Sequence, residues 1–167
     1  MSDSSQIGHL TAQARSAANR GDNGEAVRLL ERALELVPDL PERLVPALDL
    51  LGFVLFFQGD VHRALEMCER SIALSPRNAY AHQAMGMCLE RLGKVDEGIA
   101  CLRRSVQLEP TRSDAYWDLA IVLSRAGRRE EALKTVALAR ERLAQPSDAL
   151  RRLERELRVT NQDATKR

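Results

Sequence analysis

The stretch LDLLGFVLFFQGDVHRALEMCERSIALSP, residues 48–76, decides the fold of this chain. It contains two apolar helical patterns that are separated by Gly59, and it closes on Pro76. Glycine readily takes the left-handed conformation that ends a helix, and proline has no N–H with which to continue one. The stretch therefore predicts two amphipathic helices joined by a tight turn.

This arrangement recurs along the chain at a spacing of 34 to 38 residues. A fixed period of about 34 residues is typical of helical repeat proteins. Four series of residues share the spacing of 38, 34 and 34, the last of them without its final member: Gly21, Gly59, Gly93 and Gly127; Ala26, Ala64, Gly98 and Ala132; Ala33, Ser71, Ser105 and Ala139; Pro38, Pro76 and Pro110. Independent series with one period indicate four copies of the same unit.

The third unit shows how each copy would bury one face. Its first helix carries apolar residues at spacings of three and four, from Ala81 to Leu92, and its second does so from Val95 to Leu108. Small residues lie at the expected crossing, Gly86 in the first helix and Gly98 in the second. We expect the two backbones to approach closely there.

These residues resemble the tetratricopeptide repeat, whose pattern runs from a large apolar residue through Leu-Gly, an aromatic or Leu, a turn Gly and two Ala to a closing Pro. The second unit carries it as Leu48, Leu51, Gly52, Leu55, Gly59, Ala64, Ser71 and Pro76, and the third as His82, Met85, Gly86, Leu89, Gly93, Gly98, Ser105 and Pro110. The fourth has Tyr116, Leu119, Ala120, Leu123, Gly127, Ala132 and Ala139, with Ala144 in place of the proline. The first matches less closely, with Leu10, Gln13, Ala14, Ala17, Gly21, Ala26, Ala33 and Pro38.

The resemblance implies an all-α fold: a right-handed α-solenoid of about four antiparallel helix-turn-helix repeats plus a C-terminal capping helix. We expect a flexible N-terminus over 1–6, one domain over 7–159, and a disordered tail over 160–167. The repeats fall at 7–40, 45–78, 79–112 and 113–146, and the excess residues at 39–44 start a longer helix at Pro41. Segment 147–159 places Leu150, Leu153 and Leu157 on one face, as a cap does; a coiled-coil partner helix is the alternative.

The charge balance and the cysteines argue against several kinds of binding site. With 25 Lys+Arg against 24 Asp+Glu, the net charge of +1 gives no reason to expect binding to nucleic acid or to an anionic membrane. Arginine supplies 22 of the basic residues, a skew typical of a GC-rich bacterial genome. Cys68, Cys88 and Cys101 form no C-x-x-C pair and lie within apolar helical patterns, which favours buried thiols over disulfides or zinc ligands.

Catalysis and membrane insertion also find no support. The chain has no nucleophile elbow, phosphate-binding loop or zinc-protease motif, and His9, His62 and His82 are scattered over different units. We therefore expect no enzyme activity, cofactor or metal. The N-terminus lacks the order of a signal peptide, and the longest apolar run, Leu50 to Phe57, is too short to span a bilayer. A cytoplasmic protein is the expectation.

The family resemblance implies a concave groove lined by the first helix of each pair. The partner-binding residues that it implies are Asp49, Phe53, Phe56, Phe57, Tyr80, Gln83, Met87, Arg91, Trp117, Ile121 and Arg125, with Thr11, Arg15, Ala18 and Asn19 continuing the groove in the first unit. This set holds all three phenylalanines and the tryptophan. Exposed, they would form an apolar patch with charged edges, a mark of interaction sites. The alternative is that some of them, Phe56 above all, pack against the neighbouring helix.

A partner for this groove follows from its residue types. Some family members clamp a terminal carboxylate with Lys, Asn and Arg, but here the corresponding places include Asp49, Phe53, Ala84, Asp114 and Asp118, which do not attract one. We expect an adaptor or scaffold that binds an apolar or amphipathic segment of another protein. Two alternatives stay open: self-assembly into a homo-oligomer, and a regulatory accessory subunit of an enzyme or secretion complex.

Overall fold

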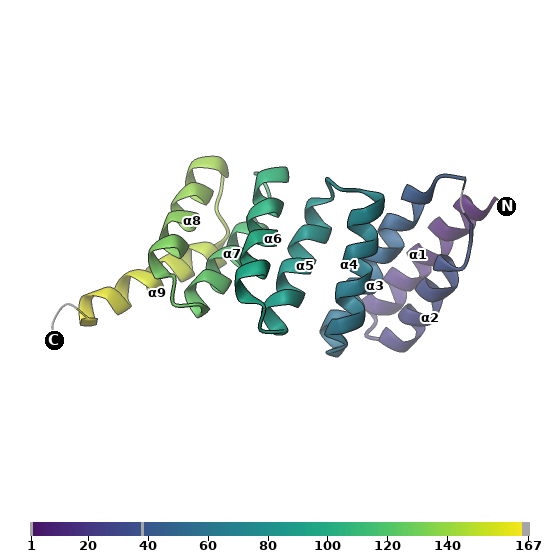
Figure 1. Ribbon diagram of the computed structural model, residues 1–167, viewed down its shortest axis with the longest axis horizontal. Coiled ribbons are helices and arrows are strands. Elements are labelled where there is room, and N and C mark those ends of the chain that lie inside the picture. The colour runs from purple at the N-terminus through teal and green to yellow at the C-terminus, as the bar shows by residue number, and fades with distance from the viewer. Residues whose placement is uncertain (1, 38, 165–167) are drawn as a thin grey trace.

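The computed structural model describes residues 2–37 and 39–164, with side chains as far as residue 158. Within that part the chain forms nine α-helices, one 3-10 helix and no strand. Their bounds are α1 Asp3–Asn19, α2 Asn23–Leu34, η1 Pro41–Leu44, α3 Val45–Gln58, α4 Val61–Leu74, α5 Ala79–Arg91, α6 Val95–Leu108, α7 Ser113–Arg125, α8 Arg129–Arg142 and α9 Asp148–Ala164. Consecutive helices pack as hairpins, so the predicted all-α solenoid is confirmed (Figure 1).

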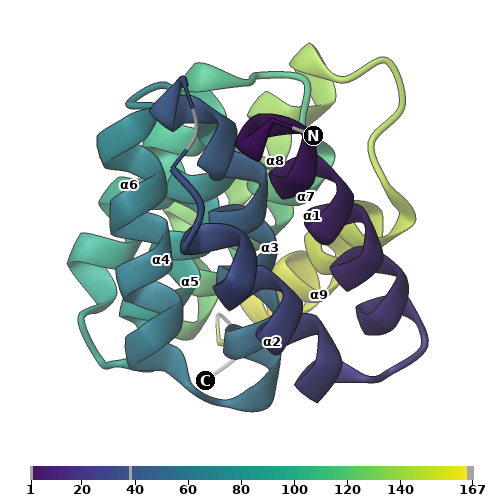
Figure 2. The ribbon, with the colours of Figure 1, turned by 90° about the vertical axis from the view of Figure 1, so that its right-hand side faces the viewer.

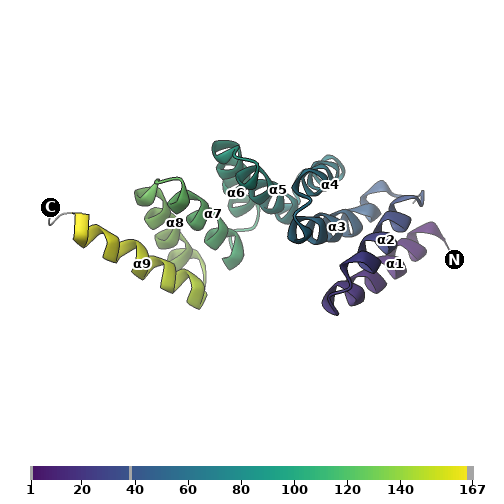
Figure 3. The same ribbon diagram turned by 90° about the horizontal axis from the view of Figure 1, so that it is seen from below.

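The hairpins stack side by side into an arch. Seen from below, α4 and α6 lie on its outer side and α3 and α5 on its inner side (Figure 3). A view along the array from the α1–α2 end shows the later hairpins stacked behind the first (Figure 2). The inner helices are the first members of each pair, which is where the sequence places the groove.

Helix ends follow the turn chemistry of the sequence. Gly59 ends α3 with φ of 88°, in the left-handed region that only glycine enters without strain. The next residue, Asp60, starts α4 by accepting a hydrogen bond from the backbone N–H of Arg63. Asn78 starts α5 in the same way, through the N–H of Ala81. The turn at Gly59 and Asp60 thus joins the two helices of one hairpin, and Asn78 begins the next hairpin.

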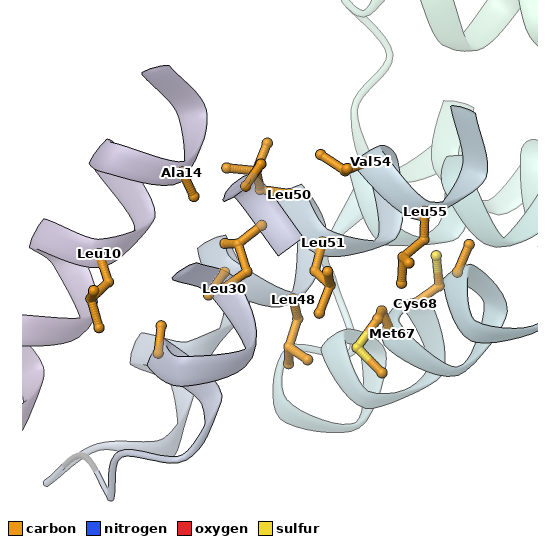
Figure 4. Packing of buried hydrophobic residues seen from close by; sticks show 14 of the residues in the cluster. Leu10, Ala14, Leu30, Leu48, Leu50, Leu51, Val54, Leu55, Met67 and Cys68 are labelled. Atoms are coloured by element: carbon orange, nitrogen blue, oxygen red, sulfur yellow. The ribbon is translucent and has the colours of Figure 1, made fainter. Parts of the chain in front are cut away.

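Two buried cores support the array. The first joins α1 to α5, with Leu10, Leu30, Leu48, Leu51 and Leu55 among its buried side chains (Figure 4). The second joins α6 to α9 and includes Tyr116. Cys68 and Cys88 are buried in the first core and Cys101 is half-buried, all three as free thiols.

Helix α9 caps the second core. Leu150, Leu153 and Leu157 are buried against α7 and α8, while Arg151 and Arg152 face outward. The side-by-side packing matches a cap rather than an unpartnered coiled-coil helix. Removing this apolar stripe from water is worth several kcal/mol, at about 1.5–3 kcal/mol for each large apolar side chain.

The ends of the chain differ from the sequence-based bounds. Helix α1 begins at Asp3, so residues 3–6, expected to be flexible, are helical. Helix α9 continues to Ala164, so residues 160–164, expected to be disordered, are helical too; the rest of the expected tail, 165–167, lies outside the described residues. At Pro41 a 3-10 turn, η1, precedes α3 instead of one continuous helix, because Pro46 occupies the first turn of α3. Among the described helices, none has the length and apolar character needed to cross a membrane.

Candidate functional site

Two adjoining hollows form the concave groove. The first, of about 500 Å³, is lined by Arg15, Ala18, Asn19, Asn23, Pro46, Asp49, Leu50, Phe53, Val54, Phe57 and Tyr80. The second, of about 210 Å³, is lined by Gly52, Phe53, Phe56, Phe57, Tyr80, Gln83, Ala84, Met87, Cys88, Asp114 and Asp118. Phe53, Phe57 and Tyr80 belong to both. Of the eleven residues expected to bind a partner, seven line these hollows: Asp49, Phe53, Phe56, Phe57, Tyr80, Gln83 and Met87.

The ridge between the hollows is aromatic. Phe53 and Phe57 lie one turn apart on α3, so both point to the same side, and their ring centroids are 4.7 Å apart. Their exposed fractions are 45% and 64%, high values for phenylalanine. The ring of Phe57 also meets Phe56 edge to face at 5.5 Å. Phe53 and Phe57 form the exposed apolar surface that the sequence predicts.

Phe56 is packed and not free, as the alternative interpretation of it expects. It is half-buried against the first core, and the Arg91 guanidinium lies 4.1 Å from its ring centroid. A guanidinium nitrogen of Arg91 also donates to the Phe56 carbonyl at 3.0 Å. The corresponding arginine of the next repeat, Arg125, pairs with Glu90 at 3.3 Å. Both arginines therefore link successive repeats and do not line the hollows.

Asp49, in the wall of the first hollow, has a structural role. Its carboxylate accepts hydrogen bonds from Ser71 Oγ at 2.6 Å and from Asn78 Nδ2 at 2.9 Å. Burial raises the pKa of Asp49, and these two donors act against that rise. Since Asn78 also starts α5, Asp49 ties α3 to α4 and to the next repeat.

A second polar network lies at the wall of the second hollow. The Gln83 side-chain amide donates to Asp118 at 2.5 Å, and its oxygen accepts from Arg112 at 2.9 Å. Arg112 also pairs with Asp114 at 2.7 Å. Burial raises the pKa of Asp118, whereas for Asp114 the hydrogen bond and charge of Arg112 overcome the effect of burial and lower the pKa.

Tyr80 joins the two hollows. It is half-buried on α5, and burial raises the pKa of its hydroxyl to about 12, so the side chain is neutral at physiological pH. The Arg112 guanidinium lies 5.5 Å from its ring centroid, within range of a cation–π interaction.

Other expected groove residues lie elsewhere. Trp117 and Ile121 are half-buried against the second core and line neither hollow. Thr11 is buried, with its hydroxyl donating to the Ile7 carbonyl at 2.8 Å. The expected set omitted Asp118 and Cys88, both of which line the second hollow. Asp118 stands one turn after Asp114 on α7, and that spacing is the signal that could have found it.

Within the described residues, no three His, Cys, Asp or Glu side chains gather in a way that could hold a metal ion. The groove carries aromatic and aliphatic surface together with carboxylates. Its lining offers apolar contact and hydrogen-bond acceptors side by side.

Comparisons with known proteins agree with this fold. Residues 2–158 match the sequence profile of the family described as the bacterial transcriptional activator domain. No curated protein matches the chain in sequence. The solved structures that it resembles include MamA, residues 41 to the end, from Desulfovibrio magneticus RS-1, with 23% identity, a TM-score of 0.71, and coverage of 81% of this chain and 74% of that one.

Two further structures extend the likeness. A thermophilic tetratricopeptide repeat protein of Thermus thermophilus is 20% identical, with a TM-score of 0.73 and coverage of 92% of this chain and 82% of that one. The K341M mutant of the Thermobaculum terrenum O-GlcNAc transferase is 26% identical, with a TM-score of 0.74 over 84% of this chain. The match spans only 27% of the transferase, so the enzyme's activity does not transfer. The likenesses confirm the tetratricopeptide-type fold.

Proposed function

The chain belongs to the bacterial transcriptional activator domain family, and on that premise we propose that it is a non-catalytic scaffold that binds an apolar or amphipathic segment of a partner protein in its concave groove. Helical repeats of this type are typical of protein-interaction scaffolds. A partner among the proteins of transcription activation fits the family's description. The observation that carries the proposal is the exposure of Phe53 and Phe57 at 45% and 64% between two hollows.

The energetics favour such a segment. Exposed aromatic rings on a rigid helix present apolar area that is ready to be buried, and aromatic residues are enriched among the residues that dominate binding energy. The helix α3 that carries them is held from both sides by buried contacts with α1, α2, α4 and α5. Because α3 is already held in place, this chain loses little conformational freedom on binding, which lowers the entropic cost of association.

A pull-down from an extract of the source cells, with bound proteins identified by mass spectrometry, tests this proposal. The variant Phe53→Ser, Phe57→Ser removes the ridge. The control variant Val37→Ser, Leu40→Ser removes the two further exposed large apolar side chains found among the described residues, which are 80% and 53% exposed and lie outside both hollows. Circular dichroism verifies that each variant is folded.

The expected result is a partner that the wild type and the control retain and that the ridge variant loses. Retention of the same proteins by all three forms would show that the groove is not the site. If the retained protein is a second copy of this chain, the scaffold acts by self-assembly, and light scattering over a concentration series would then show a larger mass than that of the monomer.

A further inference from the structure

Asp118 is the least compensated carboxylate in the groove. Its side chain lines the second hollow, and the hydrogen bond it accepts comes from Gln83, a neutral amide, at 2.5 Å. In the described part of the chain, no Arg, Lys or His nitrogen lies within ion-pair distance of it. Asp49, at the first hollow, has two donors, and Asp114 and Glu90 each pair with an arginine. Among the described residues, Asp118 therefore has no ion-pair partner.

A second carboxylate lies close to Asp118. From α7 it faces Asp114, from α5 it faces Gln83, and the positive charge that lowers its pKa is that of Arg112. The Arg112 guanidinium already forms ion pairs with Asp114 at 2.7 Å and with Glu109 at 3.5 Å. Asp114 and Asp118 both line the hollow, and of these two Arg112 forms an ion pair with Asp114, which leaves the Asp118 carboxylate without one.

Most of the other residues that line the hollow are apolar, which strengthens the attraction between Asp118 and a cation. Phe53, Phe56, Phe57 and Met87 line the same space. Charges attract more strongly where water is displaced, and aromatic faces also attract cations. The carboxylate is already partly desolvated in the free protein, as its raised pKa reflects, so part of the desolvation cost of an ion pair is met before binding.

We infer that the second hollow receives a Lys or Arg side chain of the docked segment, which pairs with Asp118 while neighbouring apolar side chains of that segment cover Phe53 and Phe57. This inference rests on the proposed function and specifies its partner: an amphipathic segment with a basic residue set among apolar ones. An acidic segment or a free terminal carboxylate is rejected by the same charges.

Selection of short random peptides displayed on phage tests the inference, because it works even when the partner is unidentified. Four forms of the full chain are used as bait: wild type, Asp118→Asn, the ridge variant Phe53→Ser, Phe57→Ser, and Glu97→Gln as control. Asparagine keeps the shape and the contact with Gln83 but removes the charge. Glu97 is an exposed carboxylate on α6 outside both hollows, so its loss changes the total charge equally.

We expect peptides selected by the wild type and the control to combine apolar residues with a Lys or Arg at a constant position, and Asp118→Asn to lose the basic preference while keeping the apolar one. In titrations with a selected synthetic peptide, replacing its basic residue by norleucine weakens binding to wild type by about tenfold or more, and has a much smaller effect on Asp118→Asn. That coupling assigns the basic side chain to Asp118.

The contrary results are separable. Peptides that need Phe53 and Phe57 but carry no basic residue, or a basic preference that survives in Asp118→Asn, overturn the inference and leave the groove proposal standing. If no peptide is selected, or if every selected peptide still binds the ridge variant, both the groove proposal and this inference are overturned.

Discussion

Gly86 and Gly98 face each other across the crossing of α5 and α6. A Cβ atom on Gly86 would lie 2.8 Å from the carbonyl oxygen of Gly98, and one on Gly98 would lie 2.7 Å from that of Gly86. Both contacts involve backbone, so no flexible side chain can move aside to relieve them. The two glycines therefore fix how closely this hairpin packs, and with it the shape of the array between the two cores.

Replacing Gly86 by alanine should separate α5 from α6. We expect a loss of about 1–3 kcal/mol in the free energy of unfolding, the usual cost of overpacking. Gly8→Ala is the matched control, because Gly8 lies within α1 with no atom near its Cβ position. At position 8 the substitution should raise the free energy of unfolding by roughly 0.5–1 kcal/mol, because alanine has a higher helix propensity than glycine. Urea unfolding of both variants checks the contrast, and equal effects at the two sites would contradict the packing account.

Ser71 and Ser105 occupy the same place in successive repeats but differ in hydrogen bonding. Ser71 donates to Asp49 and accepts from Asn78, whereas Ser105 Oγ is buried without a partner in the described structure. Ser71→Ala should destabilise by about 1–3 kcal/mol, because it leaves a half-buried carboxylate short of a donor. Ser105→Ala should be neutral or stabilise by up to about 1 kcal/mol. Chemical denaturation measures both, and the reverse order would refute the assigned network.

The apolar stripe of α9 predicts that substitutions of two neighbouring residues have different effects on stability. Leu150→Ala should cost about 2–5 kcal/mol, since Leu150 is fully buried in the second core. Arg151→Ala, its exposed neighbour, should stay within about 0.5 kcal/mol of wild type. Hydrogen exchange should show faster exchange in α7 and α8 for the leucine variant alone. Unchanged protection of those helices would show that α9 is not their cap.

In the polar network at the second hollow, Asp118 and Asp114 are predicted to contribute to the stability of the folded state with opposite dependences on pH. Burial raises the pKa of Asp118, so the folded state binds this proton more tightly than the unfolded state does, and wild-type stability from this group falls as the pH rises through the folded pKa. Asp118→Asn should therefore raise the Tm at neutral pH, with the gain shrinking as the pH is lowered. A gain that grows on acidification would contradict the sign.

Asp114 should behave in the opposite sense. The hydrogen bond and charge of Arg112 hold its pKa below the usual range against the effect of burial, so its contribution is present above the unfolded pKa and is lost as the pH falls through the folded one. Asp114→Asn should lower the Tm at neutral pH and converge with wild type in acid. Thermal unfolding followed by circular dichroism over a pH series measures both variants, and a raised Tm for Asp114→Asn would contradict the Arg112 pair.

The repeat could be predicted from the sequence because its signals are local and periodic. Glycine at the turns, small residues at the crossings and leucine at helical spacing determine the hairpins almost without reference to the rest of the chain. The ends of the chain carry no such periodic signal. Polar residues such as those near Asp3 and Ala164 give no pattern that separates a solvated helix from an irregular end, and the structure makes both segments helical.

The site could be predicted only in outline. The period places Phe53, Phe57, Tyr80 and Met87 on the inner helices, and the structure puts them along the hollows. The period does not determine which way a side chain turns, so it places Trp117 in the groove, whereas the structure half-buries this side chain against the second core. Hydrogen bonds between repeats, such as the one from Gln83 to Asp118, join residues 35 positions apart and leave no trace in a local pattern.

The most direct test of the central claim is site-specific photo-crosslinking in the source cells. A benzophenone amino acid replaces Phe57, on the ridge of the groove, or Val37, which is 80% exposed and outside both hollows. The account predicts a light-dependent adduct with a partner protein from position 57 and none from position 37. An adduct from position 37 alone, or the same adduct in equal yield from both positions, would contradict binding in the concave groove.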